Sequence, residues 1–271
     1  MSALGSPWAE LRALPTLVRV STSDHVAYRA EMTIWILTAT LPLFMLALWN
    51  AVVRDGPLAG FGQAEMARYF TATLIVRQLT SAWVVWELSF NIRTGRLSGQ
   101  LLRPLHPLFM HAVWMTTAMP FRVLILSPIV IGLVLWRPDL LAWPGWDGLA
   151  AFVLSTALAL SMSFFVQCWF GALAFWIDKS DGLFGVWFST WMIASGYVAP
   201  LEVFPAWARP ILHALPFRGM LAVPVEILGG FTKPRDALPD LALQVAWTLT
   251  FAALVRFTWA RGVRRYGAYG A

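Results

Sequence analysis

The sequence predicts an all-α integral membrane protein that crosses the bilayer six times. Hydrophobic residues make up 59% of the 271 residues and charged residues only 13%, and the mean hydropathy is +0.65. Soluble globular domains carry about twice that share of charge. The apolar residues are gathered in windows long enough to cross about 30 Å of hydrocarbon, and arginine-rich polar segments separate several of these windows.

Residues 1–30 precede the first apolar window and predict a cytoplasmic helix that lies in the membrane interface. Apolar side chains recur at helical spacing between Pro7 and Asp24, and Pro15 is expected to kink the helix. A helix of a soluble segment is the alternative. Because this stretch has no continuous apolar core, we expect no signal peptide and an insertion led by the first span.

The predicted transmembrane helices cover residues 32–53, 66–90, 108–136, 149–177, 183–201 and 241–259. An even number of spans places both termini on one side of the membrane. Arginines are concentrated in the short segments on that side, whereas acidic residues accompany the few arginines of the opposite loops. The positive-inside rule therefore predicts that both termini are cytoplasmic.

Residues 91–107 form a short polar bridge between the second and third spans, on the predicted cytoplasmic face. One or two helical turns are expected from Ser98 to Arg103, with three leucines on one side and arginines at the rim. The residues that define the bridge are Arg93, Gly95, Arg96, Leu97, Leu101, Leu102, Arg103 and Pro104. Such a bridge either only fixes the orientation of the chain or docks a soluble partner that pushes on the membrane helices.

Residues 202–230 are too apolar for a free loop and too broken to span the membrane. Two short helices are predicted, the first opened by Pro205, with a break at residues 215–217 and an end at Gly229–Gly230. They would form a hairpin that dips into the outer leaflet and packs against protein or a wet cavity. A surface loop with amphipathic helices is the alternative. The hairpin residues of interest are Phe204, Pro205, Trp207, Pro216, Phe217, Pro224 and Glu226.

Polar side chains at membrane depth are the candidates for contact with a transported molecule. They are Arg77, Gln78, Glu87, Arg122 and Gln167. An arginine at the centre of the bilayer costs at least ~2.5 kcal/mol, so Arg77 and Arg122 must face protein, water or a partner. They either bind neighbouring carbonyls or Glu87 as part of helix packing, or they line a substrate route.

The sequence carries none of the common motifs for catalysis, metal binding or nucleotide binding. It contains no His-Glu-x-x-His, Cys-x-x-Cys or Gly-x-Ser-x-Gly motif and no phosphate-binding glycine loop, and Cys168 is its one cysteine. We therefore expect no enzyme activity, metal or cofactor in this chain, so any ATP must be bound by another subunit. The arginines lie near apolar windows, which favours lipid headgroups over nucleic acid as their partners.

Short motifs in a fixed order along the chain carry a resemblance to a known family. They include Arg77-Gln78-Leu79, Gly95-Arg96-Leu97-Ser98, Leu101-Leu102-Arg103-Pro104-Leu105, residues 200–207, residues 224–228 and residues 264–271. With them, the chain resembles the membrane subunit of type-2 ABC transporters, the ABC-2 permease family.

This resemblance implies a dimer of six-helix permeases, identical or related, in the lipid of the bacterial inner membrane. Each permease would engage an ATP-binding cassette subunit that holds ATP and Mg²⁺. Residues 91–107 would be the coupling helix, and residues 202–230 the outer re-entrant helices. The expected function is export of an amphipathic or lipid-like substrate. The alternatives are an intramembrane lipid-modifying enzyme, with Arg77, Glu87 and Arg122 on a phosphate, and a secondary transporter, although the two halves show no repeat.

Overall fold

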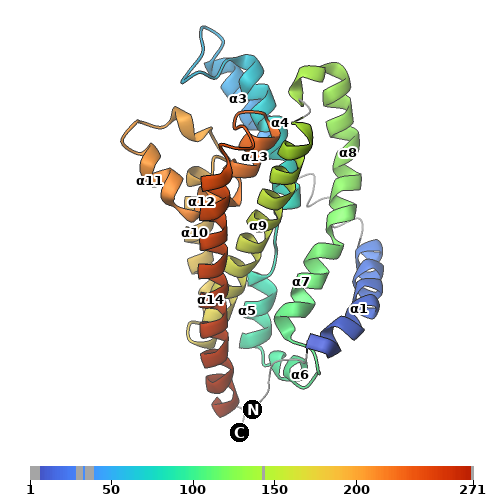
Figure 1. The fold of residues 1–271 in the computed structure, drawn as a ribbon. Helices are drawn as coiled ribbons and strands as arrows, with labels where there is room; N and C mark the ends of the chain where they lie inside the picture. Colours follow the sequence, from blue (N-terminus) through green and yellow to red (C-terminus); the bar gives the residue numbers. More distant parts are fainter. Residues whose placement is uncertain (1–6, 29–32, 34–39, 142–143, 270–271) are drawn as a thin grey trace.

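A computed structural model describes residues 7–28, 33, 40–141 and 144–269 of the chain. These residues form an elongated helical bundle (Figure 1). The helices are α1 (Pro7–Ala27), α3 (Leu41–Val52), α4 (Gln63–Leu79), α5 (Val85–Arg93), α6 (Leu97–Leu101), α7 (Pro107–Thr117), α8 (Met119–Trp136), α9 (Gly145–Ala172), α10 (Ser180–Ala194), α11 (Arg209–Ala214), α12 (Pro216–Met220), α13 (Ala222–Leu228) and α14 (Leu238–Tyr269).

The long helices α9 and α14 run side by side through the bundle, and α5, α10, α12 and α13 pack against α9 (Figure 1). Helix α6 and the C-terminal end of α14 lie at one end of the molecule, the bottom of Figure 1, and α3 lies at the other. The predicted N-terminal helix is confirmed as α1, which contains Pro15 and packs along α7. The His25 Nε2 atom of α1 lies 3.0 Å from the carbonyl oxygen of Trp114 in α7.

Three predicted spans are confirmed as helical stretches long and apolar enough to cross a membrane. They are residues 107–136, formed by α7 and α8, residues 145–175, formed by α9 and a 3-10 turn, and residues 238–266 of α14. Their lengths of 30, 31 and 29 residues exceed the roughly 20 residues that a span requires. The third, fourth and sixth windows of the sequence therefore correspond to these helices.

The prediction of one continuous helix over residues 66–90 is wrong. Helix α4 ends at Leu79, α5 begins at Val85, and residues 80–84 between them are not helical. Hydropathy did not reveal this break because the five residues are small or apolar, and hydropathy measures composition rather than backbone conformation. The second apolar window is thus a discontinuous helix.

The first and fifth windows match only in part. Helix α3 covers the second half of the first window, and residues 34–39 lie outside the described residues. Helix α10 has 15 residues and ends at Ala194, before the predicted end of the fifth span at Leu201. The chain turns at Gly196, whose φ of +84° lies in the left-handed region that glycine tolerates best.

Gly196 is expected to resist substitution because both its backbone conformation and its surroundings require glycine. A Cβ atom there would clash with the hydroxyl of Tyr69, which donates a 2.8 Å hydrogen bond to the Gly196 carbonyl. We expect Gly196→Ala to lower the free energy of unfolding by about 2 kcal/mol, measured by thermal unfolding in detergent. Gly185→Ala is the control, since a Cβ there meets nothing within 4 Å. Equal melting temperatures for the two variants would contradict this assignment.

The segment between α10 and α14 contains three short helices rather than the predicted two. The breaks predicted at residues 215–217 and 229–230 are confirmed, since α11 ends at Ala214, α12 begins at Pro216 and α13 ends at Leu228. The additional break is at Leu221, whose φ of −147° is not helical. Pro205 lies in the turn before α11 instead of opening a helix, because the first helical residue is Arg209.

Helices α12 and α13 are buried inside the upper half of the bundle, in contact with α9. Phe217 in α12 packs on Trp187 of α10 with a ring-centroid distance of 4.6 Å, and Pro224 in α13 is buried. Phe204 and Trp207 lie before α11, and Trp207 is 75% exposed. The broken backbone of α12 and α13 thus packs against protein.

Candidate functional site at the break between α4 and α5

The break between α4 and α5 is held by a buried glutamine of α9. The Oε1 atom of Gln167 accepts hydrogen bonds from the backbone N–H of Val84 (2.8 Å) and Val85 (3.4 Å). Its Nε2 donates to the carbonyl of Ala82 at 2.6 Å. An unpaired backbone group costs several kcal/mol in hydrocarbon. Gln167 therefore replaces hydrogen bonds that a continuous helix would have made.

A buried arginine of α8 binds the same break from another direction. The Nη1 atom of Arg122 donates to the carbonyl of Ser81 at 2.6 Å. A charged donor makes a stronger bond than a neutral one, which offsets part of the cost of burying the guanidinium. Of the two roles considered for the arginines, Arg122 has the contact expected for helix packing, a hydrogen bond to a neighbouring carbonyl.

Arg77, in the last turn of α4, has different surroundings. Its guanidinium carbon lies 5.0 Å from the ring centroid of Trp191 and 5.8 Å from that of Tyr197. Its buried Nε has no hydrogen-bond partner within the described ranges. Aromatic faces attract a cation, and the Tyr197 side chain also makes a hydrogen bond with the guanidinium. The Nε–H group is the donor that stays available to an anionic ligand.

A cavity of about 270 Å³ lies beside the break, between α5, α9 and α10. Arg77 and Gln167 line it together with a wall of aromatic side chains, which are Trp83, Trp86, Phe184, Trp187, Phe188 and Trp191. Trp83 and Trp86 stack with ring centroids 5.1 Å apart, and Trp86 meets Phe184 edge to face at 5.4 Å. Such a cavity can bind a flat or apolar molecule that carries a polar group.

Two of the predicted membrane-depth residues lie away from this cavity. The carboxylate of Glu87 is half exposed, and its Oε2 lies 3.7 Å from Nδ1 of His111 in α7. Gln78 is buried in the last turn of α4 and does not line the cavity. The structure thus brings Arg77 and Gln167 together at the cavity, and Glu87 pairs with His111 rather than with either arginine.

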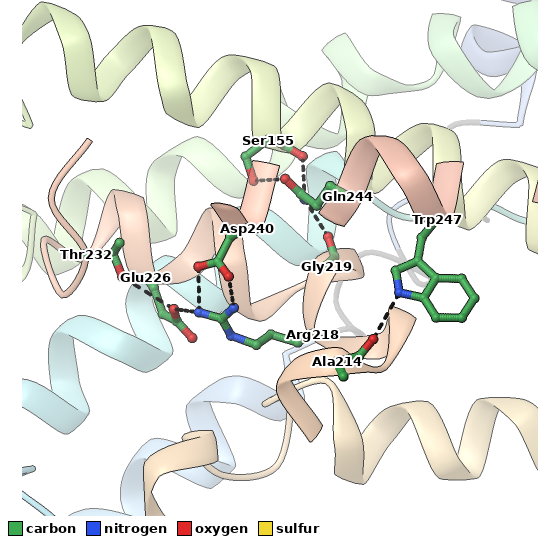
Figure 2. Close-up of polar contacts among 9 residues, drawn as sticks. All are labelled: Ser155, Ala214, Arg218, Gly219, Glu226, Thr232, Asp240, Gln244 and Trp247. Atoms are coloured by element: carbon green, nitrogen blue, oxygen red, sulfur yellow. Dashed lines mark hydrogen bonds and ion pairs between the residues drawn. The ribbon is translucent and has the colours of Figure 1, made fainter. Parts of the chain in front are cut away.

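A second polar centre joins the segment of short helices to α14 (Figure 2). Arg218 of α12 donates through Nη2 to Glu226 of α13 at 2.7 Å and to Asp240 of α14 at 2.9 Å, and its Nη1 also donates to Asp240. All three side chains are buried or largely buried. One guanidinium therefore binds two carboxylates from two other helices.

Two further α14 side chains continue this connection (Figure 2). Gln244 donates to the carbonyl of Gly219 at 2.7 Å and accepts from the Ser155 hydroxyl of α9 at 3.0 Å. Trp247 donates to the carbonyl of Ala214 at 3.1 Å. Arg218, Asp240 and Gln244 were not predicted from the sequence as a group. The signal was the spacing of Asp240, Gln244 and Trp247, which places three hydrogen-bonding side chains on one face of a helix.

The comparison with known families decides the class of the protein. The model of a family described as ABC-2 family transporter protein matches residues 34–270, most of the chain. The chain belongs to this ABC-2 family. No curated protein sequence matches it. Membership identifies a multi-pass membrane protein of a transporter, and it implies that ATP is hydrolysed on a partner subunit because ABC-2 membrane proteins lack an ATPase domain.

The bridge of this ABC-2 protein, residues 91–107, contains the five-residue helix α6, which begins one residue before the predicted turns. The prediction that its leucines share one side is wrong. Leu97 is fully buried against the bundle, Leu101 is partly buried, and Leu102 is 89% exposed. Helix α6 ends at Leu101, and at 3.6 residues per turn a residue five positions after Leu97 is turned roughly 140° away from it. Of the eight residues that define the bridge, the exposed ones are Arg93, Gly95, Arg96, Leu102, Arg103 and Pro104.

Hydrogen bonds join the bridge to several parts of the ABC-2 fold. The hydroxyls of Ser98 and Tyr266 in α14 lie 3.1 Å apart. Arg93 donates to the carbonyl of Asp178, before α10, at 3.0 Å, and Nη2 of Arg93 lies 3.9 Å from the Asp181 carboxylate. A groove of about 770 Å³ runs between the bridge, the residues before α10 and the end of α14.

His106 joins the other end of the bridge to α1, α7 and α14. Its Nδ1 accepts from the backbone N–H of Leu108 at 3.2 Å, and its ring lies 5.2 Å from that of Trp259. The backbone N–H of His106 donates to the Glu10 carboxylate of α1 at 3.3 Å. Burial lowers the pKa of His106 despite the nearby Glu10 carboxylate, which favours the neutral ring that this contact with Leu108 requires.

Proposed function

We propose that this chain is the permease subunit of an ABC exporter that moves an amphipathic or lipid-like substrate. A separate ATP-binding cassette subunit, which holds ATP and Mg²⁺, would dock on residues 91–107. The observation that supports this most strongly is the ABC-2 family match over residues 34–270. The proposal that the bridge is the docking surface is supported by its exposed apolar and cationic side chains, which lie next to a groove.

The contacts of the bridge provide a route by which a docked subunit would move the membrane helices. A push on α6 reaches α14 through Ser98 and Tyr266, and a push on the end of α5 reaches α10 through Arg93. Helix α5 also forms one side of the aromatic cavity. The cassettes must bind ATP more tightly in one permease state than in the other, since otherwise no movement results.

Orientation and assembly complete the proposal. The start of α1 contacts His106 and the end of α14 contacts Ser98, so both terminal segments lie at the end of the bundle that holds the bridge. We place this end in the cytoplasm of a bacterial inner membrane, with the segment of short helices toward the outside. A second permease, identical or related, would complete the substrate route. For that route we propose Arg77 as the substrate contact, with Arg122 and Gln167 holding the backbone beside it. Gln78 and Glu87 were also predicted for the route but lie away from the cavity.

Leu102→Asp tests the docking surface. Leu102 makes few contacts within the chain, so we expect its replacement to leave the melting temperature unchanged but to weaken cassette binding at least tenfold. Copurification with the cassette subunit and ATPase activity of the reconstituted complex measure this effect. Leu58→Asp is the matched control, an exposed leucine in the loop between α3 and α4. If both variants bind the cassette like the unaltered protein, the bridge is not the docking surface.

A further inference from the structure

The aromatic cavity beside the α4–α5 break differs from its surroundings in charge. Arg77 is the cation that lines it, and Asp181 is the one acid that the described residues contribute. That acid lies 3.9 Å from Arg93 at the bridge end of α10, so it already faces a cation. Arg122 lies close enough to Arg77 for the two charges to repel each other. The region around Arg77 is therefore positive and attracts an anion.

The two arginines nevertheless have different roles. Arg122 donates to the Ser81 carbonyl, whereas the buried Nε of Arg77 has no hydrogen-bond partner in the described part of the chain. The rings of Trp191 and Tyr197 lie against the Arg77 guanidinium, and a side-chain hydrogen bond with Tyr197 also holds it. A guanidinium fixed in this way keeps N–H groups in the geometry that a carboxylate or phosphate prefers.

The side chains that line the cavity indicate what kind of molecule carries the anionic group. Indole and phenyl rings contribute six of the fifteen lining residues, and Trp83, Trp86 and Phe188 are partly exposed on the outer surface of the subunit. A volume of about 270 Å³ holds a headgroup and the first part of an apolar body, but not a complete phospholipid. The remainder of such a molecule would extend past the exposed parts of Trp83, Trp86 and Phe188.

From these observations we infer that the cavity binds an amphipathic organic anion, with its carboxylate or phosphate on Arg77 and its apolar body against the tryptophans. The anion is either the headgroup of a membrane lipid or a free amphiphile. The identification of this anion as the transported substrate rests on the export function proposed above. The proposal of an anion-binding site does not depend on that function. Arg122 and Gln167 position the backbone beside the site without binding the ligand.

Binding is measured on the full-length protein in an uncharged detergent, through quenching of tryptophan fluorescence by dibromostearate. Its uncharged methyl ester is the matched probe. We expect the anion to bind at least tenfold more tightly than the ester. Arg77→Met should remove this difference by weakening only the anion, and Arg77→Lys, which keeps the charge, should retain part of it. Arg256→Met, which changes an exposed arginine outside the cavity, should bind both probes like the unaltered protein.

Lipid nanodiscs distinguish the two sources of the anion. Competition by phosphatidylglycerol but not phosphatidylcholine, lost in Arg77→Met, would assign the site to a lipid headgroup. Undiminished dibromostearate binding in both lipids would assign it to a free amphiphile. Equal affinity for the acid and the ester, or an unchanged affinity of folded Arg77→Met, would overturn the inference. No cassette subunit is present in these measurements, so a failure of the docking test leaves their result unaffected.

Discussion

Arg218→Met is expected to lower the free energy of unfolding by about 3–5 kcal/mol, because it leaves two buried carboxylates without their common cation. The side chains of Arg218 and Glu226 are each 7% exposed, and Asp240 is 23% exposed. Methionine replaces the volume of the arginine stem but none of its donors. Thermal unfolding in detergent should show this variant to be the least stable of those described here.

An exposed ion pair serves as the control that separates the effect of burial from the effect of losing a charge. Arg137 binds Asp139 with two hydrogen bonds of 2.9 and 2.6 Å, but 40% of its side chain is exposed. Exposed pairs contribute about 0–1 kcal/mol, so Arg137→Met should barely change the melting temperature. The stability loss of Arg218→Lys should lie between those of Arg218→Met and Arg137→Met, since a lysine keeps the positive charge but not the several N–H donors of the guanidinium. Similar losses in Arg218→Met and Arg137→Met would show that the buried network does not hold these helices.

Gln167→Met is expected to have the second largest effect, a loss of about 3 kcal/mol. The substitution keeps the side-chain volume but leaves the carbonyl of Ala82 and the N–H of Val84 without partners. Water cannot easily replace the lost bonds at membrane depth. Because the break forms one side of the aromatic cavity, we also expect dibromostearate to bind more weakly to this variant.

The matched control is Gln63→Met, a glutamine at the exposed start of α4 whose bond to the Asn50 carbonyl is 3.5 Å long. Its loss should cost less than about 0.5 kcal/mol. Protease accessibility of the segment 80–84 provides an independent readout, since only Gln167→Met should expose it. A Gln167→Met protein as stable as Gln63→Met would mean that the break does not depend on this side chain.

Agreement between sequence and structure is greatest where composition alone determines an element. Residues 108–136, 149–177 and 241–259 are predominantly apolar, and each corresponds to a long helix. The chain breaks at Pro216 and Gly229 were likewise predicted, because proline and glycine restrict or release the local backbone. These predictions needed no knowledge of the neighbouring helices.

Predictions failed where partners distant in the sequence decide the backbone. The break at residues 80–84 depends on Gln167 of α9 and Arg122 of α8. Gln167 lies 83 positions from Val84, and Arg122 lies 41 positions from Ser81. The orientation of Leu97 and Leu102 depends on how the short α6 packs on the bundle. Polar residues at membrane depth were found from the sequence, but their separate roles were not.

The sequence by itself determined that this chain is a membrane protein of the ABC-2 family, with long apolar spans and an arginine-rich bridge. Hydropathy and local motifs are sufficient for this because they are properties of consecutive residues. Only the tertiary structure decided that the helix of the second apolar window is broken, that Arg122 binds a carbonyl while Arg77 faces a cavity, and that Arg218 joins α12, α13 and α14. The reason is physical: a buried polar group must find its partner in space, and that partner is rarely its neighbour in the chain.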